Sequence, residues 1–269
     1  MADYLIDPSL LDDTKDAAAI RGVVRRSALV RDTARHAHAY GQLIGPLKGS
    51  VRIETDAGIW VVPACHAVWV PPHHHHGLHS NGPFQGWSIY VPPVLCASLP
   101  QSPVTLHGNA LLEAAIKRAA LWQDGPQTPA QHRLAQVILD EIASALPVGL
   151  NLPAPQDPRL QRIARKLAAD LADQRGMAQW ANWAGMAPRT LSRRFVAETG
   201  LTFRDWRQRA RLLAALEMLA SDQAVTTIAL DLGYENISAF IAAFKKVFGV
   251  TPGQYVAQLP DAGTTLKQA

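Results

Sequence analysis

The chain has 269 residues, of which 48% are hydrophobic and 18% are charged, and its formal net charge is +4. This length allows about two domains, and the composition is that of a globular protein. No apolar run reaches the roughly 18 residues that a membrane-spanning helix needs. The acidic start MADYLIDPSLLDD lacks the basic and apolar regions of a signal peptide. We therefore expect a cytoplasmic protein with no membrane partner.

Charge and histidine are distributed unevenly along the chain. Residues 156–269 carry 15 Lys and Arg against 10 Asp and Glu, whereas residues 1–155 carry 11 against 12. All ten histidines lie between His36 and His132. The basic half suits phosphates, and the histidine-rich half suits a ligand or a metal. Cys65 and Cys96 have no metal or redox spacing, so we interpret both as reduced, buried thiols.

The first half of the chain reads as β-structure. Residues 1–35 hold one apolar alternation, which indicates a single strand. From Tyr40 to about Leu106, short β-rich runs alternate with Gly and Pro, namely QLIG, SVRIET, GIWVVP, AVWVPP and GWSIYVPP. Strands spaced about 8–12 residues apart predict a sandwich or a barrel. The turn Thr55-Asp56-Ala57-Gly58 predicts a hairpin connection.

From Asn109 the apolar period becomes helical. Two amphipathic stretches, Leu111–Ala119 and Leu134–Leu146, are separated by Gly125-Pro126. These helices either close the barrel or pair with another subunit. The stretch PVGLNLPAPQDP that follows has four prolines and no period, which is typical of an interdomain linker.

Residues 176–258 carry one pattern twice, with an offset of 48 residues before the central turn and 49 after it. The first copy is Trp180, Ala181, Gly185, Leu191, Phe195, Gly200 and Thr202, and the second is Ile228, Ala229, Gly233, Phe240, Phe244, Gly249 and Thr251. Each copy predicts an apolar helix, a glycine turn, a second helix and a glycine stop. That arrangement is a helix-turn-helix, which sets its second helix into the DNA major groove. Double-stranded DNA is therefore the expected partner.

The outward faces of the two second helices differ. In the first unit Leu191 and Phe195 point inward, so Arg189, Ser192 and Arg193 point outward, where arginine can pair with guanine. In the second unit the outward residues are nearly apolar: Ile237, Ser238, Ile241 and Ala242. Such a helix could contact thymine methyls or dock on phosphates through Lys245 and Lys246. We predict that the first unit carries most of the sequence discrimination.

The stretch WAGMAPRTLSRRFVAETGLTFRDWRQRARLLAALEMLA, followed by IALDLGYENISAFIAAFKKVFGVTPGQY, resembles the AraC/XylS family of bacterial transcription regulators. The resemblance covers about Leu160–Val256 and implies two units, joined by a long helix, on adjacent major-groove segments. By position, it places base contacts on Arg189, Ser192 and Arg193 in the first unit and on Ile237, Ser238, Ile241 and Ala242 in the second. We also expect Thr190, Lys245 and Lys246 among the DNA-binding residues. The apolar second set departs from family members with polar base readers. RNA polymerase is a candidate further partner, and activation or repression stays open.

The run HAHAYGQL…G…WVVP…AVWVPPHHHHG is similar to a cupin-containing subgroup of that family, often associated with control of a neighbouring efflux transporter gene. The cupin pattern makes His36, His38, Gln42 and His76 candidate ligands of a divalent transition metal such as zinc, nickel, copper or iron. Glutamine in place of glutamate at position 42 lowers the negative charge and would weaken metal binding. An organic effector, or no ligand, is equally compatible with the pattern.

The other histidines and the tryptophans have simpler interpretations. His73–His75 are expected to form an exposed turn that binds metal opportunistically, as polyhistidine does. Trp60, Trp69 and Trp87 are expected mostly in the core, and as aromatic side chains they are also candidates for the wall of an effector pocket.

Together these patterns predict an α+β multidomain protein. We expect a cupin-like sensor at 1–108, dimerisation helices at 109–147, a linker at 148–158, a double helix-turn-helix domain at 159–258 and a flexible tail at 259–269. The predicted function is a homodimeric DNA-binding transcription regulator that senses a small molecule or metal and has no catalytic residues. Two alternatives are a cupin-type metal-dependent enzyme with a helical appendage and an adaptor that only dimerises and binds DNA. The enzyme would need an acidic metal ligand and would leave the repeat unexplained.

Overall fold

The computed structural model describes residues 19–122 and 127–259, which form two compact units. One unit holds an antiparallel sheet with two helices, and the other, helical unit runs from Asn151 to Gln258 and includes Ala57–Ile59. The acidic start, the Gly125-Pro126 turn and the tail from Pro260 onward lie outside the described residues. Within the described ranges, no helix combines the length and apolar character that crossing a membrane requires.

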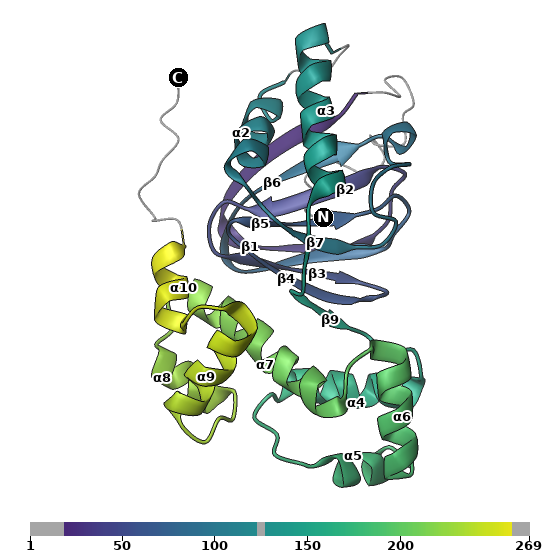
Figure 1. The fold of residues 1–269 in the computed structure, drawn as a ribbon, viewed down its shortest axis with the longest axis vertical. Helices are drawn as coiled ribbons and strands as arrows, with labels where there is room; N and C mark the ends of the chain where they lie inside the picture. Colours follow the sequence, from purple (N-terminus) through teal and green to yellow (C-terminus); the bar gives the residue numbers. More distant parts are fainter. Residues whose placement is uncertain (1–18, 123–126, 260–269) are drawn as a thin grey trace. The chain divides into compact units, whose positions relative to one another are not determined.

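The sheet is curled into a half-barrel (Figure 1). Its strands are β1 (Arg21–His36), β2 (Gly41–Pro46), β3 (Ser50–Thr55), β4 (Gly58–Pro63), β5 (His66–Val70), β6 (His76–Val91), β7 (Val104–His107), β8 (Pro147–Val148) and β9 (Asn151–Pro153). They lie in the order β8-β7-β5-β2-β6-β3-β4-β9, and β1 pairs with β6. The long β6 pairs with β3 through its first residues and with β2 through its last. The predicted N-terminal β-fold is confirmed as a curled antiparallel sheet, and this half-barrel fits a cupin-like domain.

The sheet has a hydrophobic core on each face because side chains alternate along a strand. In β2, Leu43 belongs to the core on one face and Ile44 to the core on the other. The Leu43 face is covered by α2 (Ala110–Ala119) and α3 (Pro129–Ser144) (Figure 1). The apolar stripes of both helices are therefore buried against their own sheet. A short 3-10 helix, η2 (Pro93–Leu95), follows β6.

The second unit contains two helix-turn-helix motifs, which confirms that prediction. Its helices are α4 (Pro158–Ala169), α5 (Met177–Trp183), α6 (Pro188–Thr199), α7 (Phe203–Ala220), α8 (Val225–Asp231), α9 (Ile237–Phe248) and α10 (Pro252–Gln258). The motifs are α5–α6 and α8–α9, and α7 joins them. The 18 residues of α7 extend about 27 Å. Within the segment predicted as a linker, β9 is the last strand of the sheet order but belongs to this unit. The Trp206 Nε1 donates to the Pro153 carbonyl at 2.8 Å.

Candidate functional sites

The two helix-turn-helix motifs repeat the same backbone geometry. The turn glycines have positive φ angles, 66° at Gly185 and 72° at Gly233, a conformation that costs glycine little. Just after each turn a backbone N–H returns to the first helix, from Met186 to Ala181 and from Tyr234 to Ala229, both at 2.9 Å. This equivalence shows that one local fold is used twice.

The inward faces of α6 and α9 orient their outward residues. Leu191 and Phe195 of α6 are fully buried, as are Phe240 and Phe244 of α9. The rings of Phe195 and Trp206 meet edge to face, with centroids 5.6 Å apart. Because helical residues three and four apart share a face, the predicted base-reading positions lie on the opposite side of each helix.

On α6 the outward residues are as the sequence predicted. Arg189 and Arg193 are exposed, and Thr190 and Ser192 are partly buried beside them. Neither arginine has a hydrogen bond or an ion pair within the described part of the chain. Two unengaged guanidinium groups one helical turn apart form a site for bidentate hydrogen-bond acceptors such as a guanine edge or a phosphate.

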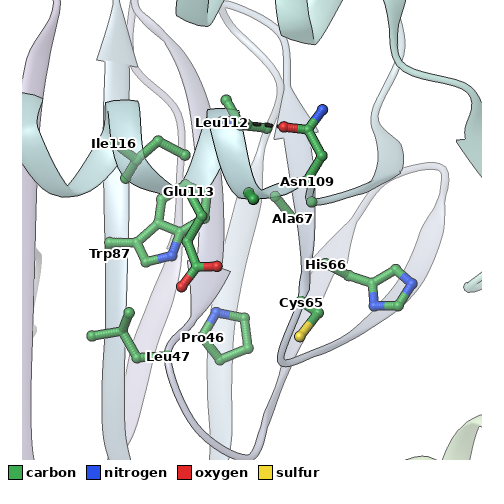
Figure 2. Close-up of a pocket in the computed structure, with 12 residues that line it drawn as sticks. Pro46, Leu47, Cys65, His66, Ala67, Trp87, Asn109, Leu112, Glu113 and Ile116 are labelled. Carbon is green, nitrogen blue, oxygen red and sulfur yellow. Dashed lines mark hydrogen bonds between the residues drawn. The ribbon is translucent and has the colours of Figure 1, made fainter. Parts of the chain in front are cut away.

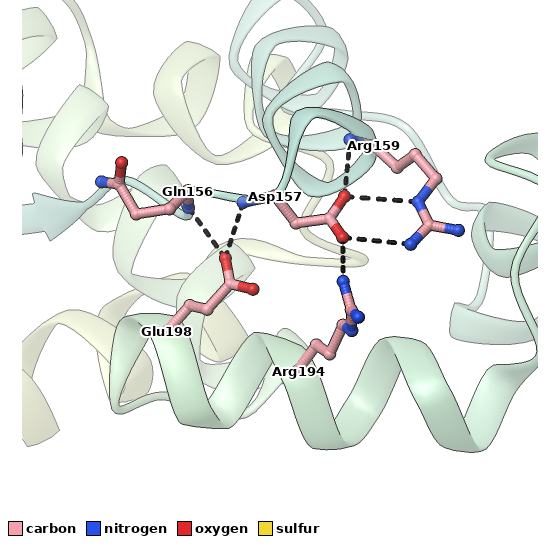
Figure 3. A network of polar contacts seen from close by, with 5 residues as sticks. All are labelled: Gln156, Asp157, Arg159, Arg194 and Glu198. Atoms are coloured by element: carbon pink, nitrogen blue, oxygen red, sulfur yellow. Dashed lines mark hydrogen bonds and ion pairs between the residues drawn. The ribbon is translucent and has the colours of Figure 1, made fainter.

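The adjacent Arg194 has a different role, which sequence reasoning missed. Figure 3 shows its guanidinium on the Asp157 carboxylate, which also accepts a hydrogen bond from the Arg159 Nη2 at 3.1 Å. The Glu198 carboxylate accepts the backbone N–H groups of Gln156 and Asp157, each at 2.8 Å. These contacts fix α6 against the start of α4.

Electrostatics reinforces this network. The Asp157 side chain is only 6% exposed. Hydrogen bonds from the Arg159 side chain, and further bonds from its backbone N–H and from Arg194, hold the pKa of the Asp157 carboxyl well below its usual value. Asp157 also caps the N-terminus of α4 by accepting the Arg159 N–H at 2.8 Å, a position where a negative charge is favourable.

On α9 the outward face is mostly apolar. Ile237 is 38% exposed and Ser238 is exposed, whereas Ile241 is partly buried. Lys245 and Lys246 are exposed in the last turn. This face offers one hydroxyl and small apolar surfaces near the start of the helix and positive charge near its end.

The spacing of the two motifs is set by side chains of α7 that bind backbone carbonyls. Arg207 donates to the Arg175 carbonyl at 2.7 Å, and Arg211 donates to the Leu171 carbonyl at 2.8 Å. The segment that they hold also reaches the second turn, because the Gln174 amide donates to the Gly233 carbonyl at 3.1 Å. No sequence pattern singled out these contacts.

The half-barrel brings together the predicted histidine set. His36, His38 and His76 offer nitrogen atoms that all lie within 4.8 Å of one another. The Gln42 Oε1 lies 3.2 Å from the His38 Nε2 and 2.9 Å from the His76 Nε2. His36 ends β1, His38 lies in the connection to β2, Gln42 belongs to β2, and His76 begins β6. His36 pairs with His76 in the ladder.

The backbone orients all three rings in the same way. Each Nδ1 lies on the carbonyl two residues away in the chain: His36 on Ala34, His38 on Tyr40 and His76 on His74, at 3.0, 2.8 and 2.8 Å. A carbonyl partner keeps the proton on Nδ1 and leaves the Nε2 lone pair for another partner. Burial lowers the pKa of His76 to about 3 and also lowers that of His36, so the neutral forms are favoured.

This donor set fits a divalent transition metal. A neutral imidazole cannot donate from both nitrogens, so the His76 Nε2 and the Gln42 Oε1, 2.9 Å apart, are two acceptors that face each other. A cation between them would satisfy both. The alternative is a Gln42 amide turned by 180°, whose NH₂ would donate to the imidazoles. In the amide orientation of the structure, the Gln42 Nε2 donates to the Ser88 hydroxyl at 3.0 Å.

Other predicted residues are separated by the fold. Trp69 and Trp87 lie on the helix-covered face of the sheet, whereas Trp60 lies on the other face, so the three do not line one pocket. The strand alternation that places them was visible in the sequence, but the pairing of strands was not. Cys65 is exposed, contrary to the expectation of a buried thiol, because it lies in a turn with φ 68°; Cys96 is buried.

Comparisons with known proteins find relatives of this chain among helix-turn-helix transcription regulators. A helix-turn-helix domain family model matches residues 180–258. HTH-type transcriptional regulator NimR from Escherichia coli (strain K12) is 34% identical over 230 residues, 83% of this chain and 82% of NimR. Transcriptional activator NphR from Rhodococcus sp is 30% identical over 195 residues, 66% of this chain and 58% of NphR. ToxT from Vibrio cholerae with a bound unsaturated fatty acid has a TM-score of 0.39 at 12% identity, covering 90% of this chain and 95% of its own.

Proposed function

The chain belongs to the AraC family of transcription regulators, and we propose that it reads DNA sequence mainly through α6. The contrast between neighbouring arginines carries this proposal. Arg189 and Arg193 are exposed and unengaged within the described residues, whereas Arg194 is held by Asp157. Two exposed guanidinium groups on the outer face of an anchored helix suit bidentate contact with guanine, and Thr190 and Ser192 flank them.

The second motif then acts mainly as a docking element. Ile237 and Ile241 present apolar surface suited to thymine methyl groups, and Ser238 adds one hydroxyl. Lys245 and Lys246 supply charge for phosphates, which position a protein without specifying sequence. The fixed spacing along α7 lets both motifs meet neighbouring segments of one duplex.

Selection from a random double-stranded DNA library tests this division of labour. The parent is compared with Arg189→Ala/Arg193→Ala and with Ser238→Ala/Lys245→Ala. We expect the first double variant to lose base preferences over one block of the site, while the second keeps the same preferences with weaker binding. Loss of preferences only in the second variant would assign sequence reading to α9 and overturn the proposal.

We further propose that the half-barrel holds a divalent transition metal, such as zinc, nickel, copper or iron, on His36, His38, Gln42 and His76. The convergence of three oriented imidazoles and an amide oxygen supports this assignment. A bound metal would act as a sensor ligand by tying β1 to β6, and the enzyme alternative loses support because the relatives are transcription regulators.

Metal analysis of the untagged protein, purified without a metal column, tests the site. We expect near-stoichiometric metal in the parent, little in His36→Ala/His38→Ala, and parental content in the control His73→Ala/His75→Ala. The control removes exposed histidines of the same run while keeping the cluster. Absence of metal after loading and dialysis of the parent would leave the cluster as a hydrogen-bonded set and favour an organic effector.

A homodimer is the proposed DNA-bound form, with RNA polymerase as a further partner and a neighbouring efflux transporter gene as a candidate target. The outward face of α3 is available for such a dimer, and it is polar: His132, Arg133, Gln136 and Asp140 are exposed. Half-sites of a dimer must keep helical phasing. Insertion of 5 bp between half-sites should therefore abolish cooperative binding, and unchanged binding would contradict a rigid dimer.

A further inference from the structure

A cavity of about 180 Å³ lies between the sheet and the first turns of α2. Its walls are apolar, with Ala67 and Trp87 from the sheet and Leu112 and Ile116 from α2. These residues belong to the core on the helix-covered face, opposite the face that carries the histidine cluster. An apolar cavity of roughly 150 Å³ accommodates benzene, so this space suits an apolar group of about the size of one aromatic ring.

The floor of the cavity depends on a glycine. A Cβ atom at Gly45 would lie 2.5 Å from the Trp87 ring, so only glycine lets the indole come this close to β2. The tryptophan is 7% exposed. Its Nε1–H has no hydrogen-bond partner among the residues that the structure describes, and an indole nitrogen can only donate.

A carboxylate faces the same space from the opposite wall. Figure 2 shows Glu113 extending from α2 toward Trp87 and Pro46, while the ring of His66 turns away. The Glu113 carboxylate also receives the Lys117 ammonium at 2.6 Å, in an i,i+4 pair that is 39% and 53% exposed. Ion pairs in contact with water contribute little to stability, so a ligand cation can replace Lys117 at the Glu113 carboxylate.

The other polar lining residues are uncharged or already engaged. Burial lowers the pKa of His66 to about 4. Partial desolvation and the nearby charge of Glu113 raise the pKa of the Cys65 thiol. The Asn109 side chain caps α2 by accepting the Leu112 N–H at 2.8 Å. Glu113 is therefore the one formal charge among the twelve lining residues.

We propose that this cavity binds a small organic cation, an amine carried on an apolar body of about one aromatic ring. The ring would occupy the space between Trp87 and Ile116, and the ammonium group would lie on the Glu113 carboxylate. An electron-rich indole face favours a nearby cation. The Glu113 carboxylate would repel an anionic ligand, so we exclude anions from this site. The existence of the binding site does not depend on the proposed function, whereas its role in regulation rests on that function.

The position of the cavity connects a ligand to α2. The end of this helix is packed tightly on β1, because a Cβ atom at Gly22 would lie 2.7 Å from the Ala120 nitrogen. Its first turns form the roof of the cavity. Occupation would thus act on the start of α2 while its end stays fixed.

Calorimetric titration of the full chain with benzylamine tests the proposal, with benzyl alcohol and benzoate as neutral and anionic probes. We expect saturable binding of benzylamine, weaker saturable binding of benzyl alcohol and no saturable binding of benzoate. Glu113→Gln should weaken benzylamine binding by roughly fivefold and leave benzyl alcohol binding unchanged. The matched control Asp140→Asn, an exposed helical acid outside the cavity, should bind like the parent.

Labelling of Cys65 by N-ethylmaleimide provides a second measurement, because Cys65 lines the cavity and is exposed while Cys96 is buried. Benzylamine should slow the labelling in the parent and fail to do so in Glu113→Gln at the same concentration. Equal affinity for the three probes, no effect of Glu113→Gln, or unprotected Cys65 would overturn the site. DNA affinity is measured separately with and without benzylamine. If benzylamine binding depends on Glu113 but DNA affinity does not change, the cavity is a binding site without a regulatory role.

Discussion

The helices α6 and α9 have the same fold and different chemistry. Each has 12 residues, two fully buried inward side chains, and a following glycine in the left-handed conformation, Gly200 or Gly249. Their outward faces differ, with two arginines on α6 that have no partner among the described residues, and with isoleucine and alanine on α9. Because inward residues determine packing and outward residues determine contacts, a repeated motif can change its partner chemistry without changing its fold.

The two helices also differ in how they are anchored. Pro188 begins α6, and Arg194 and Glu198 tie this helix to residues before α4. The helix α9 begins instead with a local cap, in which the Asn236 side chain accepts the Ala239 N–H at 2.8 Å. The helix that we expect to read bases is thus the one with long-range anchors, which preorganise its arginines.

The largest loss of stability is expected when one inward aromatic ring is removed from each motif, which tests whether the two motifs share their packing. Phe195→Ala and Phe240→Ala should each cost about 3–5 kcal/mol of unfolding free energy, because both side chains are fully buried. Urea unfolding of the full chain measures the losses, with Val196→Ala on the exposed face of α6 as control. A cost below about 1 kcal/mol at Phe240 would mean that the second motif is not packed like the first.

Removal of one outward arginine tests the difference between the helices. Arg193→Ala should cost about 1–3 kcal/mol of DNA binding and relax specificity at one base pair. Ser238→Ala on α9 should leave base preferences intact. Binding to single-base operator variants distinguishes the outcomes, and a uniform loss over all sequences would assign Arg193 to phosphate.

The anchor at Asp157 gives the first motif a dependence on acid pH. Its folded pKa is depressed, so the carboxylate stabilises the fold above the unfolded pKa of about 3.9, and this contribution disappears as pH falls through the lower, folded value. Asp157→Asn should cost about 1–2 kcal/mol near pH 7 and progressively less in acid. Urea unfolding at several pH values, with Asp231→Asn as control, is the measurement; a pH-independent cost would contradict the ionic role.

The smallest effects are expected from the lysines of α9. Lys245→Ala and Lys246→Ala should each reduce the slope of log affinity against log salt by about 1. Base preferences should not change, because phosphate contacts carry no sequence information. Fluorescence anisotropy over a salt series gives the slope, and a parental slope in both variants would remove these lysines from the interface.

Much of the architecture was predictable because it depends on local periodicity. The spacing of Trp180, Gly185 and Phe195, repeated at Ile228, Gly233 and Phe244, is enough to specify both motifs, since helix faces and left-handed turns are local properties. The β-rich half and the covering helices followed in the same way. The histidine set was found through a family pattern. The half-barrel then brings these residues together in space.

Contacts between distant residues could be decided only by tertiary structure. In the sequence Arg193 and Arg194 are adjacent and chemically identical, and their roles differ because Asp157, 37 positions from Arg194, lies beside it in the fold. The same reason separates Trp60 from Trp87 and places Glu113 at a cavity that Trp87 also lines. Periodicity determines which face of a helix or strand a residue occupies. The partner that it contacts on that face depends on which distant segment the tertiary structure places there.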